Sequence, residues 1–227
     1  MDKILRKTLK DYNTIARDFS QKRSYLWSEI KYFLKYVKTG DKVLDVGCGN
    51  GRLFSDLKNK KVSYLGIDFS EELLKIGKKK HPKAEFLKVD ISRPEDWQKV
   101  KGLYDVIFCI AVLHHFPTFK LQLFVLEQMN KRLKKGGILI FTVWNLWEEK
   151  FLGLHLKQIF WKITKGFKFK WLLVPYRVSD GKKTIIQANR FMYAFSSKEL
   201  VRLLQKAGFE IIEAKTGQNL CFGAKKC

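Results

Sequence analysis

The stretch KVLDVGCGNGRL, residues 42–53, passes from a β-rich apolar segment through three glycines into a helical pattern. Glycine inside a helix or strand costs stability, so Gly47, Gly49 and Gly51 must serve a turn. A strand that turns tightly into a helix brings backbone N–H groups to the carboxyl edge of a parallel sheet. The glycines therefore predict a place where a ligand approaches the backbone closely.

The segments around this stretch indicate an α/β fold. Short β-rich runs alternate with amphipathic helical patterns, which is typical of a mostly parallel sheet covered on both faces. The last two runs are separated only by a turn at 217–219, so we expect them to form an antiparallel hairpin. The predicted strands span residues 42–47, 63–68, 84–90, 104–113, 137–144, 209–216 and 219–226.

Two of the predicted helices carry end signals in the sequence. Apolar residues at helical spacing begin at Phe119, and the pair Gly136-Gly137 predicts the end of that helix. Ser196 and Glu199 have the spacing of a capping box, and Gly208 predicts the end of the second helix. Both helices therefore follow a predicted strand and precede another, as an alternating α/β chain requires.

Acidic residues stand at the ends of three successive predicted strands. Asp68 ends the second, at the interval where a carboxylate accepts hydrogen bonds from both ribose hydroxyls of an adenosine-containing ligand. Asp45 precedes the glycines, and Asp90 ends the third strand beside Ile91, which can pack on an adenine ring. A tight turn alone would not need these acids, so together they favour a nucleotide-like ligand.

The composition bounds the partners and the domain organisation. Forty-five Lys and Arg against 22 Asp and Glu give a formal net charge of +23, which fits nucleic acid or an anionic membrane surface and does not choose between them. Hydrophobic residues make up 46%, which excludes a disordered chain. At 227 residues we expect one domain, 1–227, with an N-terminal helical cap, 1–40, and an insertion, 147–190.

The cysteines and the apolar runs exclude several classes of protein. The four cysteines lack the spacing of a zinc site or a redox pair, so we expect reduced thiols and no metal. Charges interrupt the apolar pairs at the N-terminus, and no later run is long enough to span a membrane. These features favour a cytoplasmic protein.

In order and spacing, the motifs VLDVGCGNG, GIDFS, KVD and FCIAVLHHF resemble those of class I S-adenosylmethionine-dependent methyltransferases. The resemblance implies a Rossmann-like, seven-stranded, mostly parallel sheet with helices on both faces and a C-terminal antiparallel hairpin. It also implies S-adenosyl-L-methionine as the cofactor. In this family's arrangement the methionine part would lie beside Asp45, Gly47 and Gly49, the ribose beside Asp68 and Phe69, the adenine beside Asp90 and Ile91, and the sulfonium beside Ala111.

Motifs toward both ends of the chain resemble the tRNA wobble-uridine methyltransferases that esterify 5-carboxymethyluridine, including the methyltransferase domain of AlkB-type fusions. These motifs are YNTIARDFSQKRSYLWSEIKYFL, DVGCGNGRL, IAVLHHF, NRFMYAFSSKEL and GQN. The sequence departs from the family at RFMYAF, where members usually show a tyrosine pair followed by histidine. The resemblance implies a tRNA anticodon loop and, as for some relatives, a small activating subunit as partners. Its motifs place at the site Tyr12, Phe19, Arg23, Trp27, His114, His115, Arg190 and Phe195.

The implied chemistry needs positioning more than acid–base catalysis. A sulfonium methyl group is already activated, and a carboxylate acceptor needs no general base at neutral pH. A cation should instead orient the acceptor, and Arg23 and Arg190 are the candidates. His114 and His115 either contact the acceptor, act as a base, or are structural, with one packed at the strand end and the other facing solvent.

The insertion leaves three functions open. Its lysines alternate with aromatic residues that could grip an anticodon loop by phosphate attraction and base stacking. A helix around FLGLHLKQIFWKI could instead lie on an anionic membrane and serve a small-molecule, quinone or lipid methyltransferase. The aromatic residues could also form a lid over the core. The aromatic residues in question are Phe160, Trp161, Phe167, Phe169 and Trp171.

A non-catalytic cofactor-binding subunit is disfavoured because the cofactor motifs are intact.

Overall fold

The computed structural model describes residues 3–23, 25–164, 166, 168–179 and 184–227. Phe167 and the side chain of Trp161, both named above, lie outside this description. In chain order the elements are α1 (Lys3–Lys22), α2 (Ser28–Phe33), η1 (Leu34–Tyr36), β1 (Lys42–Val46), α3 (Arg52–Leu57), η2 (Lys58–Lys60), β2 (Ser63–Asp68), α4 (Glu71–Lys80), β3 (Glu85–Lys88), α5 (Pro94–Trp97), β4 (Tyr104–Ile110), η3 (Leu113–His115), α6 (Phe119–Arg132), β5 (Leu133–Trp144), α7 (Glu149–Lys157), α8 (Ile159–Thr164), β6 (Trp171–Ser179), β7 (Thr184–Tyr193), α9 (Ser197–Lys206), β8 (Phe209–Thr216) and β9 (Asn219–Lys226).

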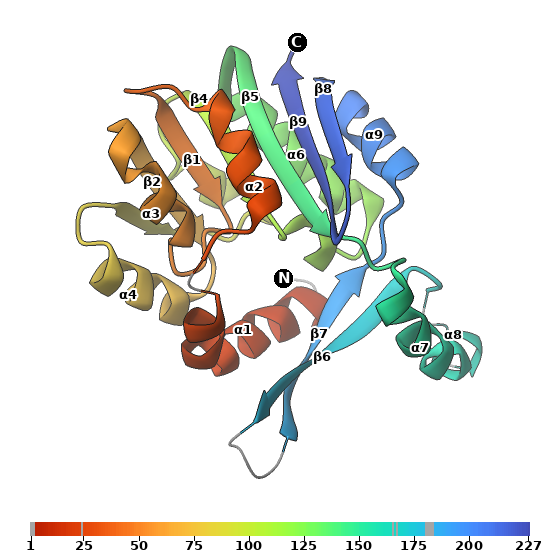
Figure 1. The fold of residues 1–227 in the computed structure, drawn as a ribbon. Helices are drawn as coiled ribbons and strands as arrows, with labels where there is room; N and C mark the ends of the chain where they lie inside the picture. Colours follow the sequence, from red (N-terminus) through yellow and green to blue (C-terminus); the bar gives the residue numbers. More distant parts are fainter. Residues whose placement is uncertain (1–2, 24, 165, 167, 180–183) are drawn as a thin grey trace.

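The main sheet has seven strands in the order β3-β2-β1-β4-β5-β9-β8. Strands β1 to β5 pair in parallel, and β9 runs antiparallel between β5 and β8. Figure 1 shows this sheet with the C-terminal hairpin at one edge. The predicted α/β, Rossmann-like sheet and its terminal hairpin are confirmed.

Helices cover both faces of the sheet and form two cores. In the first core, α6 and α9 contribute Leu126 and Leu203, which are fully buried. In the second core, α2 and α3 contribute the buried side chains of Phe33 and Leu53. Each such side chain contributes about 1.5–3 kcal/mol by its removal from water. The capping box predicted at Ser196 is present at the start of α9. The local signals and the packing thus agree for this part of the chain.

The predicted end of the helix that begins at Phe119 is wrong. α6 ends at Arg132, and β5 begins at once with Leu133. Leu133 is fully buried and pairs with Tyr104, and a register shift in this pairing absorbs the residues before Ile138. Gly136, with a φ of +72°, therefore lies in an irregular strand rather than after a helix. Tertiary burial of Leu133 outweighs the local glycine signal.

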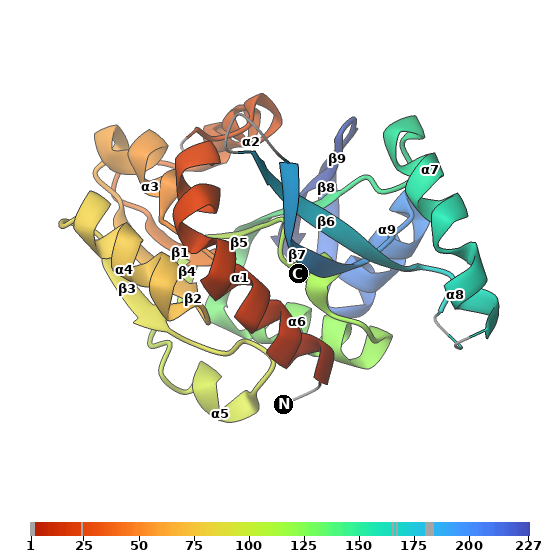
Figure 2. The same ribbon diagram turned by 90° about the horizontal axis from the view of Figure 1, so that it is seen from below.

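The insertion forms α7, α8 and an antiparallel hairpin of β6 and β7. The hairpin packs against the N-terminal helix α1, where Ile15 contacts the buried side chains of Tyr176 and Ala188. Figures 1 and 2 show α1 and the hairpin crossing beside the carboxyl edge of the main sheet. Two segments far apart in the sequence therefore cover the edge that carries the glycine turn.

Candidate active site

A cavity opens at the carboxyl edge of the sheet, beneath α1 and the hairpin. Its empty volume, including the part open to solvent, is about 1010 Å³. Of the predicted site residues, all except Asp45 and Phe195 line it, namely Tyr12, Phe19, Arg23, Trp27, Gly47, Gly49, Asp68, Phe69, Asp90, Ile91, Ala111, His114, His115 and Arg190. Phe195 is instead fully buried in the main hydrophobic core. The topology therefore gathers residues from five strand ends and from α1 into one space.

The glycine turn between β1 and α3 forms one wall of the cavity. Gly47 has a φ of +72°, and a Cβ there would lie 2.3 Å from Cγ2 of Val112. Gly49 also has a positive φ, of +57°, but a Cβ there would meet only Leu73 Cδ1, at 3.9 Å. Gly47 is thus required by packing and conformation, whereas Gly49 leaves open space beside the cavity.

Asp68, at the end of β2, fixes the glycine turn and the start of α4. Its Oδ2 accepts a hydrogen bond of 2.9 Å from the Gly49 N–H, and its Oδ1 accepts one of 2.8 Å from the Ser70 N–H. Burial raises the pKa of Asp68, and the Ser70 and Gly49 bonds oppose that shift. A carboxylate has about four acceptor positions, so these bonds do not use all of them and a ligand's hydroxyl group can still donate to Asp68.

Asp45 differs from the expectation for a residue that touches the ligand. Its side chain is 3% exposed, does not line the cavity, and accepts a hydrogen bond of 2.8 Å from the Tyr64 hydroxyl. Burial raises the pKa of Asp45 to about 7. The structure thus places Asp45 behind the turn, where it ties β1 to β2.

The third strand supplies a polar and an apolar group next to each other. Asp90 Oδ1 accepts hydrogen bonds from the backbone and the hydroxyl of Ser92, at 3.0 and 2.6 Å. The Ile91 carbonyl accepts a bond of 2.9 Å from the indole of Trp97, which holds Ile91 at the cavity wall. A carboxylate beside an aliphatic surface suits the amino group and the ring of an adenine. This end of the cavity therefore fits S-adenosylmethionine.

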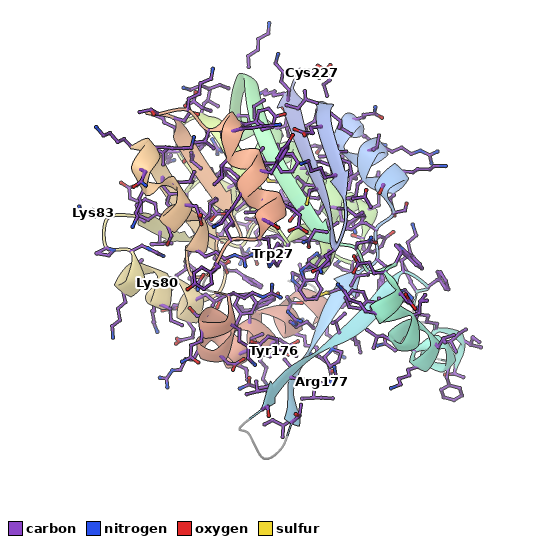
Figure 3. The ribbon with its side chains drawn as sticks, in the orientation of Figure 1. Trp27, Lys80, Lys83, Tyr176, Arg177 and Cys227 are labelled. Atoms are coloured by element: carbon purple, nitrogen blue, oxygen red, sulfur yellow. The ribbon has the colours of Figure 1, made fainter. Side chains whose placement is uncertain are left out.

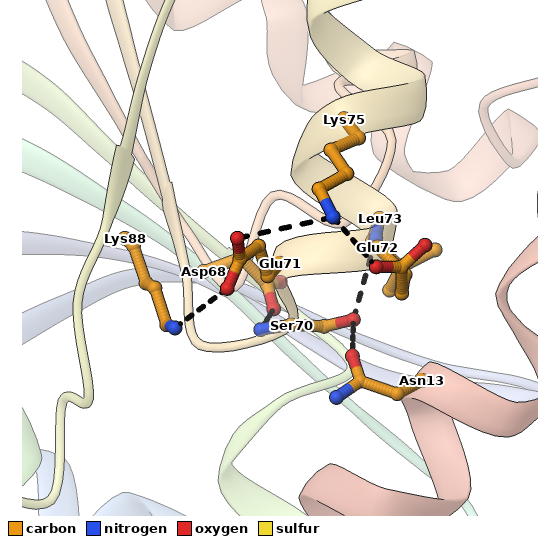
Figure 4. Close-up of polar contacts among 8 residues, drawn as sticks. All are labelled: Asn13, Asp68, Ser70, Glu71, Glu72, Leu73, Lys75 and Lys88. Atoms are coloured by element: carbon orange, nitrogen blue, oxygen red, sulfur yellow. Dashed lines mark hydrogen bonds and ion pairs between the residues drawn. The ribbon is translucent and has the colours of Figure 1, made fainter.

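The N-terminal helix α1 closes the cavity from outside. The Ser70 hydroxyl donates to Asn13 Oδ1 at 2.7 Å and accepts from the Leu73 N–H, as Figure 4 shows. Asn50, from the glycine turn, donates to the Ser20 hydroxyl at 2.7 Å. These bonds tie both the turn and the start of α4 to α1, so the helix that supplies Tyr12 is held over the cavity.

Cations gather on aromatic rings at the other end of the cavity. Arg190, on β7, is 4% exposed, and its guanidinium lies 5.2 Å from the Trp144 ring centroid and 5.1 Å from that of Tyr176. Arg23 lies 5.0 Å from the Trp27 ring and 5.6 Å from the Trp144 ring. Figure 3 labels Trp27 beside the sheet and Tyr176 on the hairpin.

These cations have no anionic partner in the part of the chain that the structure describes. No described carboxylate lies within ion-pair distance of Arg23, Arg52 or Arg190, and the buried Nε of Arg190 has no hydrogen-bond partner among the described residues. Burial lowers the pKa of Arg23, and the charge of Arg190 lowers it further. Burial lowers the pKa of Arg52 to about 10. A buried cation without a partner is costly, so this end suits an anionic ligand.

Both histidines are buried and fixed. His115 Nδ1 lies 2.8 Å from the Phe191 carbonyl, which can only accept, so Nδ1 carries the proton. His115 Nε2 therefore accepts a hydrogen bond of 2.9 Å from the Tyr12 hydroxyl. Burial lowers the pKa of His115 to about 4 and that of His114 well below its usual value. His114 is 1% exposed, so the alternative in which one histidine faces solvent is wrong.

Sequence reasoning missed Arg52 and Trp144, which lie at the cavity wall. Arg52 follows the third glycine, and Trp144 ends β5 at the same edge as the acids, so a search of every strand end would have found Trp144. Among the described residues, no cluster of His, Cys, Asp and Glu could hold a metal ion. No helix within the described ranges is long and apolar enough to cross a membrane.

Comparisons with known proteins identify similar sequences. The methyltransferase domain family matches residues 19–214. A tRNA (carboxymethyluridine(34)-5-O)-methyltransferase of Xenopus tropicalis is 35% identical over 62% of this chain and 21% of its own length, so the chain spans about a fifth of this relative. The enzyme of the same name from Schizosaccharomyces pombe is 26% identical over 89% of this chain and 88% of its own.

Solved structures share the fold. An S-adenosylmethionine-dependent methyltransferase from Methanosarcina mazei has a TM-score of 0.68 at 23% identity, covering 89% of this chain and 98% of that one. A methyltransferase chain from Haloferax volcanii, solved in complex with a methyltransferase activator, has a TM-score of 0.63 at 17% identity, covering 96% of this chain and 97% of that one. At these identities the likeness concerns the fold alone.

Proposed function

We propose that this chain, which belongs to the methyltransferase domain family and is an S-adenosylmethionine-dependent methyltransferase, methylates the carboxyl group of a 5-carboxymethyl-modified wobble uridine in tRNA. The names of the Xenopus and Schizosaccharomyces relatives suggest this acceptor. The net charge of +23 supports an RNA partner. The observation that carries the proposal is the pair Arg23 and Arg190, two cations at the cavity without a described carboxylate partner.

The residues around the cofactor act by binding and exclusion. When bound, S-adenosylmethionine supplies a methyl group that is already activated by its sulfonium charge. In the proposal Asp68 accepts hydrogen bonds from ribose hydroxyls, and Asp90 with Ile91 holds the adenine. Gly47, Gly49 and Ala111 line the place of the methionine part, and Gly49 leaves open space there. Tyr12 on α1 covers the site and excludes water, which favours transfer to the intended acceptor.

The residues at the acceptor end orient a carboxylate. A guanidinium presents paired N–H donors that match the two oxygens of a carboxylate. Arg190, held between the Trp144 and Tyr176 rings, would fix the acceptor so that one oxygen points at the methyl group. A carboxylate is ionised at neutral pH and needs no base, which agrees with the lowered pKa of His115. The histidines then act as positioning groups for Tyr12 and for the Trp144 backbone.

Methylation of tRNA by radiolabelled cofactor tests the proposal. Wild-type protein should label tRNA from cells that make carboxymethyluridine and should leave tRNA from cells lacking that modification unlabelled. The label should be released by mild alkali, because the product is an ester. Equal labelling of both tRNA pools would reject the carboxylate acceptor, and no labelling of either pool would reject a tRNA substrate.

A small activating subunit belongs to the same proposal. The chain from Haloferax volcanii with a similar fold was solved in complex with such an activator. The chain co-expressed with a small activator protein should methylate tRNA faster than the chain purified alone. Equal rates would remove the subunit from the proposal and leave the acceptor unaffected.

One observation favours a second candidate, a lipid or quinone methyltransferase at a membrane surface. α7 and α8 expose Leu156 and Ile163 at 69% and 78%, within an apolar stripe at helical spacing that also includes Leu152, Ile159 and Phe160. Such a stripe can enter an anionic membrane surface. Sedimentation with anionic vesicles, lost in the variant Leu156→Glu/Ile163→Glu, together with no labelling of tRNA, would favour this candidate.

A further inference from the structure

The helix α1 has two faces of opposite character. Its inner face contributes Tyr12 and Phe19 to the cavity. Its exposed residues all carry Lys, Arg, Thr or Gln side chains, and none is acidic or large and apolar. Most follow one another at intervals of three or four, so they form one outer face. We call this outer face the basic stripe; it consists of Lys3, Arg6, Lys7, Lys10, Thr14, Arg17 and Gln21.

Most of the charge on the basic stripe is uncompensated. Lys7 pairs with Asp11 at 2.6 Å, which neutralises one cation. Arg6, Lys10 and Arg17 have no described carboxylate within ion-pair distance. Asp18, the acid nearest Arg17 in sequence, is engaged by Lys22 and by the Tyr176 hydroxyl. The stripe therefore presents cations along a helix about 30 Å long.

A groove beside the stripe extends the positive surface. It lies between α1, α4 and β7, and it brings Arg17 together with Lys75 and Lys79. The groove also holds the acids Asp18 and Glu72, but Glu72 pairs with Lys75 at 2.9 Å. Figures 1 and 2 show α1 and α4 side by side. Arg17 and Lys79 therefore carry positive charges in this groove that no described carboxylate pairs with.

We infer that the basic stripe and the adjoining α4 groove bind the phosphate backbone of the RNA and lead it to the cavity. This inference rests on the proposed tRNA acceptor. A membrane would require exposed apolar side chains on α1, and the apolar face of this helix is instead buried against the hairpin and the cavity. Arg23 follows the last residue of α1, so a strand that tracks the helix ends at the acceptor site.

Salt-dependent binding of unfractionated tRNA tests the inference. The variant Lys10→Gln/Arg17→Gln removes one lysine and one arginine from the stripe. The control Lys198→Gln/Arg202→Gln removes the same two residue types from the exposed face of α9, on the other side of the molecule. Each lost phosphate contact reduces the slope of log K against log salt by about 0.7–0.9. The slope of the stripe variant should therefore be smaller by about 1.4–1.8, and its Kd for tRNA near 0.1 M salt should be roughly 25- to 60-fold higher than that of wild type.

The readouts separate this inference from the proposed function. The control variant should bind tRNA like wild type, and both variants should bind S-adenosylmethionine with wild-type affinity by calorimetry, which checks the fold. An unchanged slope for the stripe variant, or equal losses for both variants, would overturn the inference. If the slope changes as predicted but wild type forms no ester on tRNA, the wobble-uridine proposal fails and the backbone site stands.

Discussion

Replacing Arg190 with glutamine separates binding of the acceptor from stability of the fold. Arg190 is 4% exposed, lies between the Trp144 and Tyr176 rings, and has no described carboxylate within ion-pair distance. Its buried Nε lacks a hydrogen-bond partner among the described residues. The charge of Arg190 is therefore not neutralised by a described carboxylate, and the glutamine variant removes that charge while keeping a polar side chain.

The expected loss follows from the contact that Arg190 would make in the proposed reaction. A hydrogen bond to a charged group contributes about 1.5–3 kcal/mol. Because about 1.36 kcal/mol changes a rate tenfold, kcat/KM for tRNA should fall about 10- to 150-fold. The loss of two cation–π contacts, each about 0.5–2 kcal/mol, opposes the relief of an unpaired buried charge, so the free energy of unfolding should change little.

The assay compares Arg190→Gln with Arg177→Gln on tRNA that carries carboxymethyluridine. Arg177 is exposed on β6 of the same hairpin, and its backbone carbonyl, which accepts from Lys22, is kept in the variant. Arg177→Gln should retain wild-type kcat/KM. Wild-type kcat/KM in Arg190→Gln, or a loss of kcat/KM that tracks a lower Tm, would refute the reasoning.

Four further changes test other parts of the site. Gly47→Ala should abolish S-adenosylmethionine binding in calorimetry, because the new Cβ would lie 2.3 Å from Val112 Cγ2; wild-type affinity would contradict that packing. Tyr12→Phe removes the bond to His115 and should lower the free energy of unfolding by about 1 kcal/mol in urea, and no change would show that the bond adds nothing. Burial raises the pKa of Asp45 to about 7, above its value of about 4 in the unfolded chain. The free energy of unfolding should therefore fall as pH rises from about 4 to about 7, because the buried carboxyl group loses its proton. Asp45→Asn should thus gain up to about 4 kcal/mol over wild type at about pH 8 and less at about pH 5, and an equal gain at both would argue against the raised pKa. Burial lowers the pKa of His115 to about 4, so the ring is neutral above the unfolded value of about 6.5, and kcat/KM should be flat from about pH 6 to about pH 8; a fall near pH 6.5 would indicate a histidine that titrates in the reaction.

The sheet and the glycine turn could be predicted because their signals are local. The alternation of strand and helix patterns, the three glycines and the capping box at Ser196 each depend on neighbours within a few residues. The end of α6 could not be placed in this way, because Leu133 joins β5 through pairing with Tyr104, far away in sequence. The hairpin of β6 and β7 was not predicted, although β-rich runs flank residues 180–183, because the lysines and aromatic residues between 147 and 190 do not show how the two runs pair.

The cavity was predicted in its residue types more than in its geometry. Motif positions identified most of its lining, but whether a residue faces the ligand depends on packing between strands. Asp45 shows this, because its bond to Tyr64 places it behind the turn. Trp144 shows the converse, since its contacts with Arg23 and Arg190 exist only once α1 and the hairpin meet over β5. Neither arrangement has a signal in the order of the sequence.

Nucleoside mass spectrometry of tRNA after incubation with cofactor that carries a deuterated methyl group tests the central claim most directly. The wobble uridine should appear as the methyl ester of 5-carboxymethyluridine with the deuterated methyl group, and the unesterified carboxymethyluridine should fall by the same amount. Deuterated methyl on another nucleoside, or none in tRNA while the protein binds S-adenosylmethionine, would contradict it.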